Sequence, residues 1–138
     1  MIQTVILENH EFFRLGVKSL FQDNPDIRIT GEASNGEDFI SLLDCTLADV
    51  ALMSVNKPYD DRSMDFVYIL RKKRPDMKIL VLANEGSAQT VQSMMAAGIN
   101  GYIGKRQAKS AELEKAIRMV AAGGEYIGRI SSERLIEN

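Results

Sequence analysis

The stretch Thr4-Val5-Ile6-Leu7-Glu8-Asn9-His10 decides the fold of this chain, because a short apolar run stops there at three polar residues. Its first four residues are rich in β-branched side chains, which is typical of a strand buried on both faces of a sheet. Between Phe12 and Phe21 the apolar residues then recur at helical spacing, and Asn24-Pro25-Asp26 ends that pattern. The opening of the chain therefore predicts a buried strand followed by an amphipathic helix.

The same unit of strand and helix is predicted four more times. Short, continuously apolar strands with right-handed crossovers place helices on both sides of a parallel sheet. We therefore predict an α/β fold with a doubly wound, five-stranded parallel sheet. The further strands are expected over residues 27–33, 50–55, 78–83 and 101–103, and the further helices from Asn35, over about 63–74 and 87–97, and over 110–122.

Composition and charge limit the class of protein. The 138 residues, 45% of them hydrophobic, suffice for one domain with one sizeable core. With 17 basic and 19 acidic residues the formal net charge is −2, which gives no general attraction to nucleic acid or anionic lipid. Cys45 has no second cysteine to pair with, and the sequence shows no signal peptide and no apolar run of roughly 20 residues. We expect a cytoplasmic chain that does not enter a membrane.

In doubly wound sheets, binding and catalytic residues gather at the carboxyl ends of the strands. At these positions the sequence carries Glu8-Asn9, Ser54, Ala83-Asn84 and the stretch after Ile103. No glycine-rich loop follows the first predicted strand, so a flavin or another phosphate-bearing ligand finds no cradle there. A flavodoxin-like ligand-binding protein is therefore disfavoured.

Four longer stretches are jointly more specific than any single motif. They are Val5-Ile6-Leu7-Glu8-Asn9-His10-Glu11-Phe12-Phe13-Arg14-Leu15-Gly16, Gly31-Glu32-Ala33-Ser34-Asn35-Gly36-Glu37, Arg74-Pro75-Asp76-Met77-Lys78-Ile79-Leu80-Val81-Leu82 and Ala96-Ala97-Gly98-Ile99-Asn100-Gly101-Tyr102-Ile103-Gly104-Lys105. Together with the order of elements, they make the chain resemble the NarL/FixJ-type receiver domains of response regulators, from about residue 3 to residue 128. The resemblance implies a flavodoxin-like receiver fold with strand order 2-1-3-4-5. It also implies a regulatory rather than an enzymatic role, with no cofactor.

The resemblance further implies a phosphorylation pocket whose positions can be inspected one by one. In the family, two acidic residues after the first strand help hold Mg²⁺, and an aspartate ending the third strand accepts a phosphoryl group. A hydroxyl residue at the end of the fourth strand and a lysine after the fifth contact that group. The corresponding residues here are Glu8, Asn9, Ser54, Ala83 and Lys105.

Three of these five positions depart from the family pattern. Asn9 supplies no second carboxylate, so affinity for Mg²⁺ should be weak, with Glu8 as the remaining candidate ligand. The Ser54 hydroxyl cannot form the acyl phosphate that an aspartate forms, and Ala83 offers no donor to phosphoryl oxygens. We therefore predict an atypical receiver, a pseudo-receiver without the phosphoacceptor aspartate, which holds no metal and has no catalytic residue.

Lys105, one of these five positions, and Tyr102, an additional one, match the family. Lys105 corresponds to the family lysine, and Tyr102 corresponds to the aromatic residue whose inward or outward position reports activation. In the altered pocket the lysine would face only Glu8, with Asn9 and Ser54 nearby. We therefore predict a permanent Lys105–Glu8 contact, or hydrogen bonds that hold one arrangement of the loops.

The resemblance also suggests interaction surfaces and a domain organisation. Receiver domains that the chain resembles form dimers or bind partners through the fourth helix, fifth strand and fifth helix, or through the first helix. We expect a homodimer or a complex with a protein partner, with residues 1–128 as the receiver-like domain. Residues 129–138 look like the start of a linker helix. In the family such a linker leads to a helix-turn-helix DNA-binding domain, which is absent from this sequence and through which alone DNA would be contacted.

The predicted function is that of a phosphorylation-independent regulatory domain of a two-component-type transcriptional response regulator. A stand-alone adaptor of the same fold remains open as an alternative. Arg71-Lys72-Lys73-Arg74 is interpreted as a solvated helix end rather than as a partner patch, because cations complement the dipole there. His10 is interpreted as a polar loop or capping residue, and Ser54 as a packing residue rather than a modification site.

Overall fold

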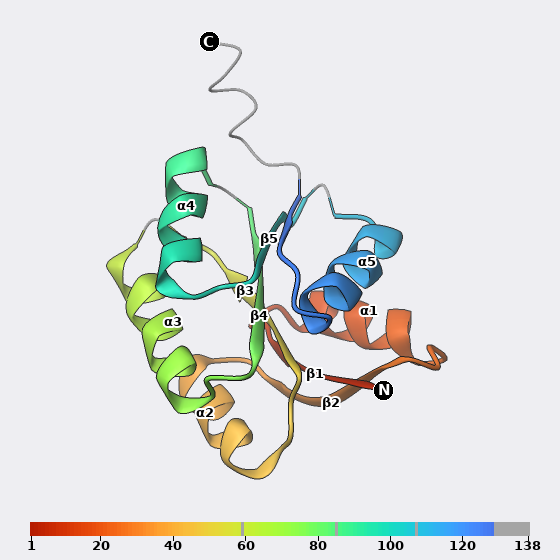
Figure 1. Ribbon diagram of the computed structural model, residues 1–138. Coiled ribbons are helices and arrows are strands. Elements are labelled where there is room, and N and C mark those ends of the chain that lie inside the picture. The colour runs from red at the N-terminus through yellow and green to blue at the C-terminus, as the bar shows by residue number, and fades with distance from the viewer. Residues whose placement is uncertain (59, 85, 107, 129–138) are drawn as a thin grey trace.

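The computed structural model describes residues 1–58, 60–84, 86–106 and 108–128. Strands and helices alternate along the chain, and every strand pair is parallel (Figure 1). The elements are β1 (Ile2–Leu7), α1 (Glu11–Phe21), β2 (Ile27–Ala33), α2 (Gly36–Cys45), β3 (Val50–Val55), α3 (Asp61–Lys73), β4 (Lys78–Ala83), α4 (Ala88–Ala97), β5 (Gly101–Gly104), α5 (Ser110–Ala121) and β6 (Tyr126–Ile127).

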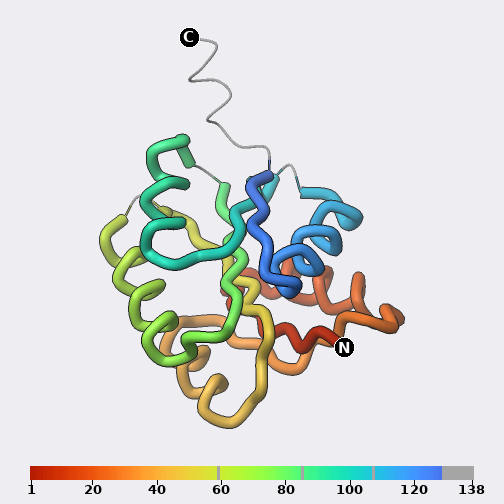
Figure 2. The backbone as a smooth tube through the Cα atoms, viewed as in Figure 1, coloured from red at the N-terminus to blue at the C-terminus, as the bar shows by residue number. Residues whose placement is uncertain are grey.

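A central sheet divides the molecule into two helical layers. The strand order is β2-β1-β3-β4-β5-β6, with α1 and α5 on one face and α2, α3 and α4 on the other, as both backbone views show (Figures 1 and 2). Each face has its own apolar core. Val17 of α1 and Ile117 of α5 pack in one core, and Phe39 of α2, Val67 of α3 and Met94 of α4 pack in the other. The described helices include none long and apolar enough to cross a membrane.

The predicted fold class is confirmed, and the number of strands is corrected from five to six. The predicted order 2-1-3-4-5 is retained, and β6 is added at the outer edge of β5. The two residues of β6, Tyr126 and Ile127, are too few to show the alternation typical of a strand. Only their pairing with β5 identifies them as a strand. The predicted bounds of β2, β3 and β4 agree with the structure. β3 and β4 are largely apolar runs, whereas β2 also contains polar residues such as Arg28 and Glu32.

Side-chain caps explain where several helices begin. Asn35 accepts a hydrogen bond from the N–H of Asp38 and opens α2, as predicted. Asp60 accepts from the N–H of Arg62, so α3 begins at Asp61 and not at the predicted Ser63. His10 occupies the N-cap position of α1, although its side chain makes no capping hydrogen bond.

The basic end of α3 corrects the prediction of a solvated helix end. Arg71 donates from Nη2 to the carbonyl of Gly98 at 2.6 Å and to Oδ1 of Asn100 at 3.0 Å. From Nη1 it donates to the carbonyl of Met77 at 2.5 Å. These bonds connect the end of α3 with the loops before β4 and β5. Arginine can do this because its planar group carries five donors, a property that helical spacing alone does not reveal.

Replacing Arg71 by methionine should lower the free energy of unfolding by about 2 kcal/mol, because partly buried carbonyls lose charge-assisted hydrogen bonds. The adjacent Lys72 is exposed, so Lys72→Met serves as the matched control and should change stability by less than about 0.5 kcal/mol. Urea unfolding followed by circular dichroism measures both variants. Equal losses in the two variants would contradict the stabilising role assigned to the hydrogen bonds of Arg71.

Candidate functional site

The carboxyl ends of β1, β3 and β5 bring together three of the predicted site residues. Leu7 of β1 pairs with Met53 of β3, so the residues that follow them, Glu8 and Ser54, are neighbours across the two strands. Lys105 follows β5, and its N–H donates to the carbonyl of Ala83 at the end of β4 (2.8 Å). The parallel sheet thereby places an acidic, a hydroxyl and a basic side chain at one edge.

The Glu8 carboxylate is the centre of this site and is only 1% exposed. Its Oε1 accepts hydrogen bonds from the Ser54 hydroxyl at 2.5 Å and from the Lys105 ammonium at 2.6 Å. Its Oε2 accepts from the backbone N–H of His10 at 2.7 Å. The predicted contact between Lys105 and Glu8 is therefore present, and both carboxylate oxygens are engaged within the chain.

These contacts decide the ionisation of Glu8. Burial by itself raises the pKa of the carboxyl group, and it is the largest single influence. The hydrogen bonds from Lys105, Ser54 and the His10 N–H, with the charge of Lys105, together outweigh burial and lower the pKa below its ordinary value. Glu8 is thus a charged carboxylate at neutral pH and forms a salt bridge with Lys105, whose side chain is 15% exposed.

A second contact of Lys105 was not predicted. Its ammonium lies 4.3 Å from the centre of the Phe13 ring on α1, which is a cation–π geometry. The helical spacing of α1 does place Phe13 toward the core, but its contact with Lys105 depends on how the lysine side chain extends from the end of β5 to α1. Lys105 therefore connects the end of β5 with both β1 and α1.

Arg14 holds the first turns of α1 against the same edge of the sheet. Its Nη1 donates to the backbone carbonyl of Glu8 at 2.8 Å, and its Nε forms a 2.9 Å ion pair with Glu32 of β2. Lys18, one turn further along α1, pairs with the other oxygen of Glu32 at 2.5 Å. The orientation of α1 is thus fixed by charged groups that adjoin the site.

The side chains of the other predicted site residues are not among these contacts to Glu8. Asn9 is exposed, and Ala83 is buried in the core beneath α2, α3 and α4. Tyr102 is fully buried and points inward. A Cβ added to Gly86 would lie 2.2 Å from the Tyr102 hydroxyl, so the inward position needs a glycine in the loop after β4.

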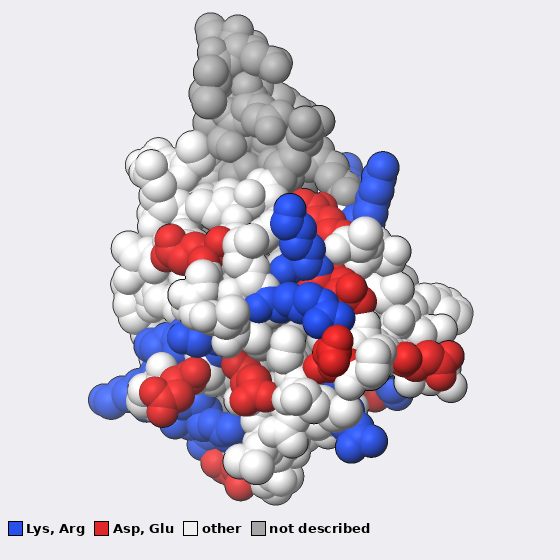
Figure 3. All heavy atoms as spheres, turned by 45° about the vertical axis from the view of Figure 1, so that its right-hand side comes forward, with Lys and Arg blue, Asp and Glu red and all other residues white. Residues whose placement is uncertain are grey.

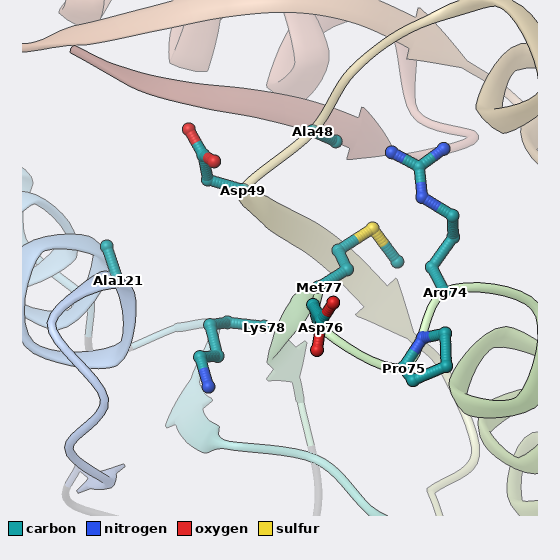
Figure 4. Close-up of a pocket in the computed structure, with 8 residues that line it drawn as sticks. All are labelled: Ala48, Asp49, Arg74, Pro75, Asp76, Met77, Lys78 and Ala121. Carbon is teal, nitrogen blue, oxygen red and sulfur yellow. The ribbon is translucent and has the colours of Figure 1, made fainter.

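Two hollows lie at opposite ends of the sheet. Ser54 lines an open cavity of about 1050 Å³ between α2 and α3, together with apolar side chains such as Met53 and Phe66. A smaller hollow of about 440 Å³ lies at the amino ends of β3 and β4 and is lined by Asp49 and Lys78, among others (Figure 4). Because that second hollow is at the end of the sheet away from Glu8, it does not belong to the site.

The donor set does not fit the Mg²⁺ that receiver domains hold. A hard divalent cation prefers several anionic oxygens. Among the described residues, Glu8 is the carboxylate that contacts Ser54 and Lys105; its charge is balanced by Lys105, and Ser54 contributes a neutral hydroxyl. The described residues contain no group of three or more His, Cys, Asp or Glu side chains arranged to hold a metal ion.

Comparison with known proteins agrees with the fold. A family model described as the response regulator receiver domain matches residues 4–118. The chain belongs to this family of receiver domains.

Its relatives include transcriptional regulators of the NarL type. The chain is 32% identical over 136 residues to the transcriptional regulatory protein DegU of Brevibacillus brevis, covering 99% of this chain and 57% of that protein. It is 32% identical over 119 residues to the nitrate/nitrite response regulator NarL of Escherichia coli K12, covering 86% and 54%. The chain thus spans a little over half the length of the curated relatives it matches.

Solved structures show the same fold. The isolated REC domain of RcsB from Salmonella enterica serovar Typhimurium in the apo form aligns over 100% of both chains, with a TM-score of 0.83 and 18% identity. A LuxR family DNA-binding response regulator from Silicibacter pomeroyi aligns over 94% of this chain and 98% of that chain, with a TM-score of 0.80 and 21% identity.

Acidic pH should remove stability that Glu8 provides. Because the folded pKa of Glu8 lies below the ordinary value of 4.5, the unfolded chain binds the proton first as the pH falls. The contribution is complete above that ordinary value and is lost as the pH falls through the folded pKa. Between about pH 6 and about pH 3, the free energy of unfolding should therefore fall more for the wild type than for Glu8→Gln.

Urea unfolding at each pH measures this difference, with Glu37→Gln as the control because Glu37 is exposed. The control should follow the wild type. If Glu8→Gln loses as much stability as the wild type over the same pH interval, the charged state assigned to Glu8 is wrong.

Proposed function

We propose that this chain is a phosphorylation-independent regulatory domain of a two-component-type transcriptional regulator and that it acts by dimerisation. The observation that carries the proposal is the Glu8 carboxylate, whose oxygens already accept from Lys105, Ser54 and the His10 N–H. In this arrangement the lysine is neutralised within the chain. Regulation would then depend on association instead of on a phosphoryl group.

The chemistry of the site supports the absence of phosphotransfer. Attack on a phosphodonor by Ser54 would give a phosphate ester and not the labile acyl phosphate of an aspartate. The hydroxyl also donates its proton to Glu8 at 2.5 Å, and it contributes no negative charge that would attract Mg²⁺. Glu8 itself is 1% exposed and is unsuited to attack on a phosphodonor in solution.

The relatives support a role in transcription. DegU is named a transcriptional regulatory protein, and DevR/DosR of Mycobacterium tuberculosis, 28% identical over 123 residues, is named a DNA-binding transcriptional activator. We propose that DNA contact in this system belongs to a further domain of a longer protein. The predicted linker helix at residues 129–138 lies outside the described residues. On the face that carries α1 and α5, acidic and basic side chains are interspersed, which disfavours direct binding of nucleic acid there (Figure 3).

The outer face of α1 is the dimerisation surface that we propose. Phe12 is 80% exposed, and Leu15 and Leu20 are also exposed. Between them, Gly16 is in the helix interior, where glycine costs about 1 kcal/mol relative to alanine. Among the described residues nothing lies within 4 Å of a Cβ added to Gly16, so the chain itself gives no reason for a glycine. A glycine would be explained if the same helix of a second copy approached the backbone closely at this position.

The α4–β5–α5 face is less suitable for this role. The outward residues of α4 include Gln89, Gln92 and Ser93, which are polar. In addition, β6 pairs with the outer edge of β5 and covers it. The structure therefore favours α1 of the two surfaces that receiver domains offer.

Incubation with acetyl phosphate and Mg²⁺ should leave the wild-type chain unmodified, because no carboxylate occupies the acceptor position. Intact mass spectrometry measures the adduct, and amide NMR with Mg²⁺ followed by beryllofluoride reports the pocket. The double variant Asn9→Asp/Ser54→Asp restores two carboxylates and is the positive control, expected to bind millimolar Mg²⁺. A hydroxylamine-sensitive adduct on the wild type, or joint shifts of Ser54, Tyr102 and Lys105 with beryllofluoride, would overturn the proposal.

Replacing Phe12 by aspartate should weaken dimerisation at least about tenfold, because burial of a large aromatic side chain is replaced by burial of a charge. Sedimentation equilibrium over a concentration series measures the dissociation constant. Tyr68→Asp is the matched control, since Tyr68 is an aromatic residue on α3 that is 56% exposed. Equal weakening by the two variants, or a wild type that is monomeric throughout, would contradict dimerisation through α1.

A further inference from the structure

The open cavity of about 1050 Å³ beside Ser54 lies where the order of strands reverses. From β1 the chain goes to β2 on one side, and it then returns to β3 on the other side of β1. Leu7 at the end of β1 and residues 53–55 at the end of β3 line this cavity. In doubly wound sheets, ligands bind in the crevice outside the carboxyl ends of the strands at such a reversal. The position of the cavity therefore indicates a site for a small molecule.

The inner wall of the cavity is apolar. Its apolar side chains come from the sheet, from α2 and from α3, and they are Leu7, Ile40, Met53, Val55 and Phe66. Gly36 lets the ring of Phe66 lie against the start of α2, since an added Cβ would be 3.0 Å from Cε1 of that ring. An apolar ring of a ligand would be removed from water against this wall, which favours binding.

The Ser54 hydroxyl adds a polar contact of defined direction. Its single proton is donated to Glu8 at 2.5 Å, and the ionised Glu8 has no proton to donate in return. The Ser54 oxygen can therefore only accept a further hydrogen bond. A ligand group that reaches Ser54 from the cavity must be a donor, such as a hydroxyl.

The charged side chains around the cavity favour an anion. They are Glu37, Asp38, Lys57, Asp60 and Arg62. Asp38 accepts from the Asn35 side-chain amide at 3.0 Å, and Asp60 accepts from the N–H of Arg62 at 2.9 Å. Both carboxylates thus lie at helix starts, whose partial positive charge offsets theirs. In the part of the chain that the structure describes, neither Lys57 nor Arg62 forms an ion pair, so two cations are available beside one remaining carboxylate.

The backbone at Lys57 is held in position without a ligand. Its carbonyl accepts from the N–H of Asp60 at 3.0 Å and from the Ser63 hydroxyl at 2.8 Å. A wall that is already ordered lowers the entropy cost of binding.

We infer that this cavity binds a small aromatic acid that carries a hydroxyl group at the end opposite its carboxylate. The ring would lie against Met53 and Phe66, the hydroxyl would donate to Ser54, and the carboxylate would lie near Lys57 and Arg62. A carboxylate does not need the glycine-rich phosphate cradle that this chain lacks. The inference deepens the proposed function and rests on it in one respect, because Ser54 must stay unmodified to accept from the ligand.

An amide NMR titration with phloretate tests the inference, since this acid has a phenol at one end and a carboxylate at the other. Phloretate should shift the amide signals of Gly36, Ser54 and Phe66 with a dissociation constant of about 1 mM or tighter. Tyramine has the same phenol and an ammonium in place of the carboxylate, and it should bind at least about threefold more weakly. Absence of these shifts with phloretate, or equal affinity for tyramine, would overturn the inference.

Two variants locate the ends of the ligand. Arg62→Glu should weaken phloretate binding at least about threefold and should not weaken tyramine binding. Lys72→Glu is the matched control, because Lys72 is an exposed cation at the other end of α3, and it should change neither affinity. Ser54→Ala should weaken phloretate at least about threefold more than hydrocinnamate, the same acid without the hydroxyl. Equal effects of Arg62→Glu and Lys72→Glu, or equal weakening of the two acids by Ser54→Ala, would contradict the assigned site.

An intact mass of the wild type after incubation with acetyl phosphate separates this inference from the proposed function. A phosphoryl adduct on Ser54 would overturn the proposed function. An unmodified chain in which phloretate shifts none of the cavity signals would overturn the ligand site alone.

Discussion

The buried carboxylate of Glu8 is the constraint on which the carboxyl edge of this sheet depends. An ionised group that is 1% exposed loses most of its hydration, and in a protein interior this costs several kcal/mol unless partners replace the water. Lys105, Ser54 and the His10 N–H supply those partners. They come from the ends of β5, β3 and β1, so the requirement of one carboxylate fixes the relative positions of three strands.

The same constraint extends to the surfaces that other proteins would meet. Lys105 contacts Phe13, the neighbour in sequence of the exposed Phe12 on α1. Three residues before Lys105, the backbone carbonyl of Tyr102 accepts a hydrogen bond from the N–H of Gly128, which follows β6. Lys105 and β5 thus connect the site with α1 on one side and with the outer edge of the sheet on the other.

Most of the fold was predictable because its signals are local. The apolar runs of β3 and β4 and the Asn35 cap of α2 depend on residues adjacent in the sequence. The site was predictable in part, since the carboxyl ends of parallel strands lie at the same edge of a sheet. In addition, the family resemblance assigned Glu8 and Lys105 to one pocket. What was missed depends on tertiary packing. Phe13 beside Lys105, the carbonyls beneath Arg71, and β6 are all defined by partners far away in the chain.

The presence of Lys105 does not require phosphoryl chemistry. Removing one partner of a buried ion pair leaves the other charge uncompensated, which typically costs about 3–5 kcal/mol. Because that is a large fraction of the free energy of unfolding of a domain this size, a chain with Glu8 at the end of β1 needs a cation there for stability alone. The lysine thus has a structural reason to be present that is independent of the residue at position 54. Our proposal that the chain does not transfer a phosphoryl group rests instead on the residues at positions 9, 54 and 83.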